Sequence, residues 1–146
     1  MIISCNTTNL NKALQTVQRA IISKPSTPIF SGIHLLTRDG KLEIQAMDIN
    51  MAISCNIEAD IIEAGEIVVS AKHFSELVRK LPEENLTITK NTENHTIKVT
   101  SGKSEYQLLL MNEEDYPKFP GFDAEKSIAI EDTMIKELIK KTIFSC

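Results

Sequence analysis

The sequence predicts an α+β protein in which one unit, a strand and a helix followed by three strands, occurs twice. Two segments carry apolar residues at helical spacing, and their stripes match at an offset of about 64 residues. Between them, short segments of alternating apolar and polar residues are separated by polar turns. The 146 residues, 42% of them hydrophobic, suffice for one domain with a core and the start of another.

The first unit begins with a short predicted strand over residues 1–5 and a helix that Asn6 can cap. Prolines at positions 25 and 28 end this region, because proline cannot continue a helix. The helix has one apolar stripe. It consists of Leu10, Ala13, Leu14, Val17 and Ile21.

Three strands should follow this helix. Residues 29–38 and 42–46 are predicted to form a hairpin, since Asp39-Gly40 between them is a strong turn signal. The third strand covers residues 51–58, where larger apolar side chains alternate with small or polar ones.

The same order then starts again. Residues 66–69 read as a strand, Ser70 as a helix cap, and Pro82 as the end of the second helix. The apolar stripe of that helix is Phe74, Leu77, Val78 and Leu81. Strands are predicted near residues 86–89, 96–100 and 106–111. The second half is therefore a diverged repeat of the first.

Residues 117–123 contain two prolines and a glycine and mark the predicted domain boundary, so that residues 1–122 form one domain. Residues 123–146 are expected to open a second domain, with a strand over 127–130 and a helix. The apolar face of this helix has nothing left to bury it before Cys146, so we expect the chain to be part of a longer protein. The face consists of Met134, Ile135, Leu138, Ile139 and Ile143.

Composition excludes several classes of protein. No apolar run approaches the roughly 20 residues of a membrane span, and the N-terminus lacks a secretory leader, so we expect a cytoplasmic protein with no membrane partner. The net charge is -4, but residues 6–24 contain no acidic side chain. Cys5, Cys55 and Cys146 form no Cys-x-x-Cys pair, and no histidine has metal-ligand spacing, which predicts reduced thiols and no metal site.

The sequence offers no catalytic residue and no cofactor site. His34, His73 and His95 belong to different predicted elements, and neither a nucleophile elbow nor a glycine-rich phosphate loop is present. Asp48 is interpreted as a turn or hydrogen-bonding residue rather than a general base.

Five short motifs lie in order along the whole chain. They are Lys24-Pro25-x-x-Pro28-Ile29 leading to Asp39-Gly40 and Ala46-Met47-Asp48-Ile49-Asn50; Val69-Ser70-Ala71-Lys72-x-Phe74; Leu81-Pro82; Ser101-Gly102-Lys103-Ser104; and Glu114-Asp115-Tyr116-Pro117. In residues, order and spacing these motifs resemble the bacterial DNA polymerase sliding clamp family, the beta subunit. Two residues depart from the family's pattern, Met47 where threonine is usual and Tyr116 where phenylalanine is usual, and neither touches the function inferred below.

This resemblance implies the DNA-clamp fold, with antiparallel sheets outside and two helices on the inner face. In the family, three such domains form a subunit, and two subunits close head to tail into a homodimer ring around double-stranded DNA. The ring is a non-catalytic processivity factor that tethers the replicative polymerase. The replicative DNA polymerase and the clamp loader would bind through domains absent here, because the partner-peptide pocket of the family lies between its second and third domains.

Basic residues lie beside the apolar stripes of both helices or just after them. They are Lys12, Arg19, Lys24, Lys72, Arg79 and Lys80. On each helix, two of them are seven residues apart and therefore nearly aligned. Such cations on one wall of a channel can contact phosphates without reading base sequence. A merely solvated helix face is the alternative.

The resemblance favours the first interpretation, most clearly for Lys24, Lys72 and Arg79, which correspond to basic positions lining the hole of the ring. It also supports the other three, to a smaller degree. We therefore predict one concave, helix-lined face opposite the sheet. It should carry Lys12, Arg19, Lys24, Lys72 and Arg79.

Residues 106–111 are apolar on both faces, although the last strand of a unit is expected at a sheet edge, and such a strand favours a partner. The resemblance implies that this edge and the second helix contact the third domain of a neighbouring subunit. The contact residues would be His73, Leu77, Tyr106 and Leu108. The alternative is that Leu109 and Met111 pack beneath a loop.

Two other classes of function remain open. A β-rich protein-interaction module would never meet DNA, and salt-dependent retention on DNA by the full-length ring would separate it from a clamp. An enzyme would require a cluster of titratable residues.

Overall fold

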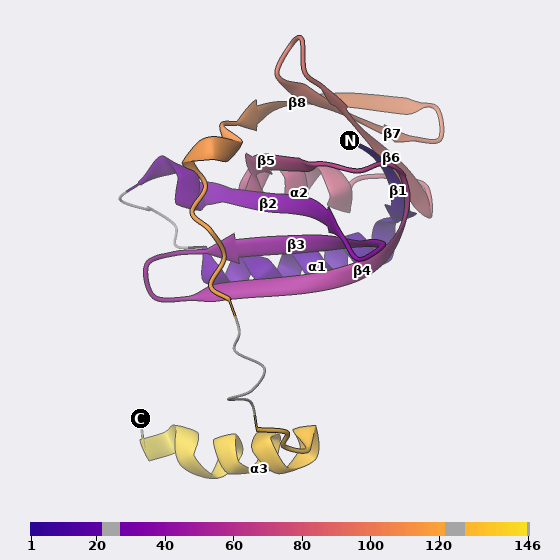
Figure 1. Cartoon of the computed structure of the whole chain (residues 1–146). Coiled ribbons are helices and arrows are strands. Elements are labelled where there is room, and N and C mark those ends of the chain that lie inside the picture. The colour runs from indigo at the N-terminus through magenta and orange to yellow at the C-terminus, as the bar shows by residue number, and fades with distance from the viewer. Residues whose placement is uncertain (22–26, 122–127, 146) are drawn as a thin grey trace.

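The computed structural model describes residues 1–21, 27–121 and 128–145 (Figure 1). Eight strands form a closed barrel in the order β1-β4-β3-β2-β5-β8-β7-β6. The strands are β1 (Ile2–Asn6), β2 (Gly32–Arg38), β3 (Lys41–Met47), β4 (Ala52–Glu63), β5 (Glu66–Ser70), β6 (Asn85–Asn91), β7 (Thr96–Ser101) and β8 (Ser104–Met111). The helices are α1 (Thr7–Val17), α2 (Ala71–Arg79) and α3 (Asp132–Thr142), with short 3-10 turns η1 (Gln18–Ala20), η2 (Pro28–Ser31), η3 (Glu113–Asp115) and η5 (Ile143–Ser145).

The predicted α+β fold and its doubled unit are confirmed, because β1-α1-β2-β3-β4 is followed by β5-α2-β6-β7-β8. All strand pairs are antiparallel, and the two units interlock. The first strand of each unit pairs with the last strand of its own unit and with the second strand of the other. Thus β1 lies between β4 and β6, and β5 lies between β8 and β2.

The two helices lie side by side on one side of the sheet formed by β2 to β5 (Figure 1). The predicted stripes are the buried faces: Leu10, Leu14, Val17 and Phe74 are fully buried in the main core. Burial of each such side chain contributes about 1.5–3 kcal/mol relative to exposure.

The predicted cap of α1 and the predicted first turn are confirmed, whereas the residue predicted to cap α2 makes no capping hydrogen bond. The Asn6 carboxamide oxygen accepts from the Asn9 amide at 3.0 Å, as a cap should. Ser70 occupies the equivalent position of α2, but its hydroxyl makes no capping hydrogen bond. Asp39 and Gly40 have φ angles of 51° and 75°, which is the two-residue turn that fits the twist of a hairpin.

Two strand boundaries differ from the prediction. The strand expected from residue 29 begins at Gly32, because Pro28 starts a 3-10 turn, and a side chain at Gly32 would come within 2.9 Å of Val68. The third strand extends beyond residue 58 to Glu63, since its second half pairs with β1.

The prediction of a strand over residues 127–130 is wrong for residues 128–130, which are irregular. No strand of the described part of the chain pairs with them. Residue 127 lies outside the described residues. The helix after it is confirmed as α3. Its apolar side chains are between 40% and 58% exposed over Met134 to Ile139. None of the helices described is long and apolar enough to cross a membrane.

β8 is an edge over only part of its length. Residues 104–109 pair with β7, whereas the pairing with β5 involves Leu110 and Met111 alone. Leu109 is 76% exposed, so it does not pack beneath a loop, whereas Met111 is half-buried against a second apolar cluster. That cluster, formed by Ile29, Met47, Val68 and Tyr116, lies outside the barrel, because Val68 points away from the inward-facing Ile67 and Val69.

Candidate functional site

The surface between α1 and α2 is a groove of about 400 Å³. Gln18 joins its two walls, since the side-chain amide of Gln18 donates to the Ala71 carbonyl at 3.1 Å and to the Ser75 hydroxyl at 2.6 Å. The side of each helix that lines this groove faces away from the core and carries exposed side chains.

The structure brings Lys72 and Arg79 together on this groove, and both are exposed. Glu76 lies between them in the helix and also lines the groove. Lys12 and Arg19 are exposed on α1 and η1 but do not line it, so the predicted basic face is only partly gathered here. Lys24 lies outside the described residues.

Of the six predicted cations, the five that the structure describes form no ion pair with any other described residue. Lys80, at the C-terminal cap of α2, is also exposed but faces a different groove. An unpaired ammonium or guanidinium group in water can contact a phosphate without first breaking a salt bridge. The arrangement is suited to nonspecific contact with an anionic backbone.

A second groove, of about 310 Å³, separates α2 from β8. Its lining contains all four residues predicted to form a subunit interface: His73 and Leu77 from the helix, and Tyr106 and Leu108 from the strand. Tyr106 is 40% exposed, so its ring is accessible to a partner. The four residues to which the family resemblance pointed therefore lie together on one surface.

The groove continues along the unpaired stretch of β8. A neighbouring hollow of about 480 Å³ shares His73 and Leu108 and adds Leu109. An open strand edge, the exposed Leu109, the half-buried Leu108 and a helix beside them form a surface that can accept another strand.

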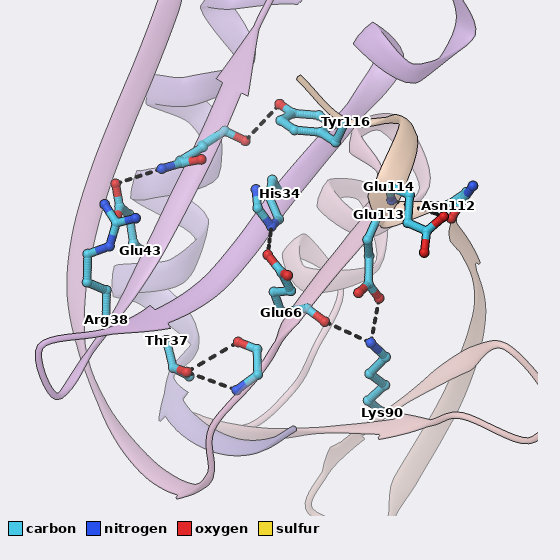
Figure 2. A network of polar contacts seen from close by, with 12 residues as sticks. His34, Thr37, Arg38, Glu43, Glu66, Lys90, Asn112, Glu113, Glu114 and Tyr116 are labelled. Atoms are coloured by element: carbon cyan, nitrogen blue, oxygen red, sulfur yellow. Dashed lines mark hydrogen bonds and ion pairs between the residues drawn. The ribbon is translucent and has the colours of Figure 1, made fainter. Parts of the chain in front are cut away.

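A polar network on the outer face of the sheet was missed by sequence reasoning (Figure 2). Glu43 is only 7% exposed, and its carboxylate accepts from the Gln45 amide and the Ser54 hydroxyl, both at 2.8 Å. Burial alone would raise the pKa of Glu43, but these two hydrogen bonds and the Arg38 charge at 3.2 Å hold the pKa below its usual value. The available signal was weak, because a strand that carries Glu43 and Gln45 also fits a solvated outer face.

The remaining titratable residues have structural surroundings. Burial raises the pKa of Cys5 to about 12 and also raises that of Cys55, so both thiols stay protonated at neutral pH. The Asp48 carboxylate accepts from the amides of Asn50 and Met51 at 2.7 Å, which makes it a turn residue, as expected. Within the described part of the chain, no group of three His, Cys, Asp or Glu side chains is placed to hold a metal.

Comparison with known proteins shows the family to which the chain belongs. The family described as "DNA polymerase III beta subunit, N-terminal domain" matches residues 1–120. The beta sliding clamp of Bacillus subtilis strain 168 is 31% identical over 144 residues, covering 93% of this chain and 38% of that protein. The beta sliding clamp of Vibrio harveyi is 30% identical over 139 residues, covering 94% of each.

Solved structures agree with this result. The crystal structure of the DNA polymerase sliding clamp from Bacillus subtilis matches with a TM-score of 0.92 and 28% identity, over 99% of this chain and 40% of that one. The chain therefore spans less than half the length of its Bacillus relatives.

Proposed function

Because this chain belongs to the DNA polymerase III beta subunit family, we propose that it supplies the first domain of a sliding clamp, a ring that encircles duplex DNA and tethers the replicative polymerase. The proposed domain covers residues 1–122, and residues 123–146 open the second domain. In this proposal the protein has a non-catalytic role and is located in the cytoplasm.

One observation supports this proposal more than any other. The two helices that the internal repeat makes equivalent lie side by side, and their outward faces carry exposed cations without ion pairs to described residues. In a ring with the sheets outside, this face would line the hole. Lys72 and Arg79 would contact phosphates directly, and Lys12, Arg19 and Lys80 would add to the positive field.

The β8 edge would close the ring. We propose that the groove between α2 and β8 receives the third domain of a neighbouring subunit, with Tyr106 and Leu108 in the contact and His73 and Leu77 beside them. Strand addition at an open edge supplies main-chain hydrogen bonds, and the leucine and tyrosine side chains supply apolar contact. Polymerase and clamp loader would bind beyond the residues of this chain.

The test is retention on closed DNA by the full-length protein. After loading by its clamp loader, the ring should remain on a nicked circular plasmid at moderate salt and slide off once the plasmid is cut to linear form. A protein-interaction module without a DNA role would show no difference between the two DNA forms. Equal loss from circular and linear DNA would refute the proposal.

A further inference from the structure

The chain does not leave the barrel directly after β8. Residues 112–121, named the strap here, turn back through η3 and run across the outer face of β2, β3 and β4 (Figure 1). A cleft of about 890 Å³ lies between the strap and this sheet face. The strap therefore crosses several strands with an open cleft between it and the sheet.

The first anchor of the strap is an ion pair with a residue of strand β6. The Lys90 ammonium group of β6 donates to the Glu113 carboxylate at 2.5 Å and to the Glu66 carbonyl at 3.1 Å (Figure 2). The side chains of Lys90 and Glu113 are only 19% and 23% exposed. A shielded, hydrogen-bonded pair of this kind stabilises more than an ion pair in open solvent.

The second anchor is aromatic. Tyr116 is 8% exposed, and its ring packs in the second apolar cluster with Ile29, Met47 and Val68. Its hydroxyl donates to the Gln45 carbonyl at 3.5 Å, and its ring centre lies 5.2 Å from that of His34. Burial raises the pKa of Tyr116 to about 12, in agreement with a seated phenol.

Neither anchor is a main-chain pairing between strands of the barrel. The amides of Asp115 and Tyr116 donate within the strap, to Asn112 and Glu113, rather than to a strand. The second cluster is also distinct from the main core, which contains α1, α2 and the inward side chains of the strands. Lifting the strap would break these two anchors and the contact of Phe119 with the second cluster, and it would leave every strand pairing among the described residues intact.

We infer that the strap is a releasable joint: Lys90 and the socket of Tyr116 hold residues 112–121 against the barrel, and their release frees the strap without unfolding the barrel. In a clamp, the joint would be the last docked segment of the first domain before the second, and this consequence alone rests on the proposed function. The docking and its release are properties of the described chain.

Amide hydrogen exchange of the whole 146-residue chain, followed by mass spectrometry, tests the inference. Lys90→Met keeps the apolar stem and removes the ammonium group. It should speed exchange of peptides covering 112–121 about tenfold and leave peptides from β2 and β3, which Lys90 does not contact, unchanged. The matched control is Lys98→Met on the neighbouring strand β7, which removes a solvent-accessible ion pair with Glu105 of β8 that involves no strap residue, and it should leave strap exchange at the parent rate.

Tyrosine emission gives a second measurement. The chain has two tyrosines and no tryptophan, so in a Tyr106→Phe background Tyr116 is the single emitter. Acrylamide should quench it weakly in the parent and several-fold more strongly after Lys90→Met. Unchanged exchange and quenching, or exchange that rises in β2 and β3 as much as in the strap, would overturn the inference that the strap is a releasable joint. Neither readout involves DNA, so this failure is separate from failure of the clamp proposal.

Discussion

The side-chain amide of Gln18 and the hydroxyl of Ser75 lie 2.6 Å apart, and this hydrogen bond ties the end of α1 to α2. The two helices come from different copies of the repeat, and this side-chain hydrogen bond links them directly. Replacing Gln18 by alanine should lower the free energy of unfolding by about 0.5–1.5 kcal/mol. Urea unfolding followed by circular dichroism measures it.

The pairing itself is isolated by a double-mutant cycle. Gln18→Ala and Ser75→Ala should be less costly together than the sum of the two single changes. Gln15→Ala is the control, since Gln15 is an exposed residue of the same groove. Strict additivity of the two changes would show that the hydrogen bond contributes nothing to stability.

The cations of the helix groove should determine how DNA binding depends on salt. In the full-length protein, Lys72→Gln and Arg79→Gln should each weaken binding to a short duplex at low salt. Each should also reduce the slope of log affinity against log salt by about 0.9 for every phosphate that the variant no longer neutralises. Fluorescence anisotropy measures both quantities.

The control for this experiment is Lys98→Gln, which removes the same charge from the outer side of the barrel. It should leave the slope unchanged. If it reduced the slope as much as Arg79→Gln does, net charge rather than the helix face would govern binding.

The 146-residue chain by itself should neither retain DNA nor recruit polymerase. One domain would meet roughly two to four phosphates, and such binding is very weak at physiological salt. Pull-down with polymerase or clamp-loader peptides should therefore be negative, and processive synthesis should not be stimulated. Submicromolar binding of such a peptide to residues 1–146 would reveal a site that the family does not explain.

Tyr106 should be required for ring closure but not for folding. Because its ring is partly exposed in the groove beside α2, Tyr106→Asp should weaken dimerisation of the full-length protein at least about tenfold without lowering its melting temperature much. Sedimentation velocity reports the dimer. Ile62→Asp, at a 70% exposed apolar residue of β4, is the control and should leave the dimer intact.

Glu43 should contribute to loss of stability in acid. Its pKa in the folded chain is lowered, so its contribution is present above the unfolded pKa and is lost as the pH falls through the folded pKa. Between about pH 5 and about pH 3, Glu43→Gln should therefore lose less stability than the parent. Denaturant unfolding at several pH values measures this.

Local patterns predicted most of the elements, because their causes lie within a few residues. The stripe from Leu10 to Val17 specifies the buried face of α1, and Asp39-Gly40 specifies its hairpin. Closure of the barrel depends on contacts between distant segments, and no local pattern encodes it. For the same reason the second half of β4 was missed: Ala59 is in a strand because Cys5 pairs with it.

For the candidate surfaces, too, part of the arrangement was predictable from the sequence and part depends on contacts between distant segments. Helical spacing indicated that Lys72 and Arg79 share a face, and the structure places both on one groove. Position in the repeat, together with family resemblance, led to the four residues of the β8 groove. The seat of Tyr116 was not predictable, since it combines residues from η2, β3 and β5 that meet only in the folded barrel.

The interlocked pairing of the two units has a consequence for synthesis on the ribosome. Cys5 in β1 is paired on one side with Ala59 and on the other with Leu86, so the first strand stays half-paired until the second unit has been made. The last strand to join, β8, ends at Met111. Contacts this distant in sequence make folding slow, and the emerging first half exposes open strand edges meanwhile. The nascent barrel should therefore depend on chaperones, or on rapid translation, until β8 has left the exit tunnel.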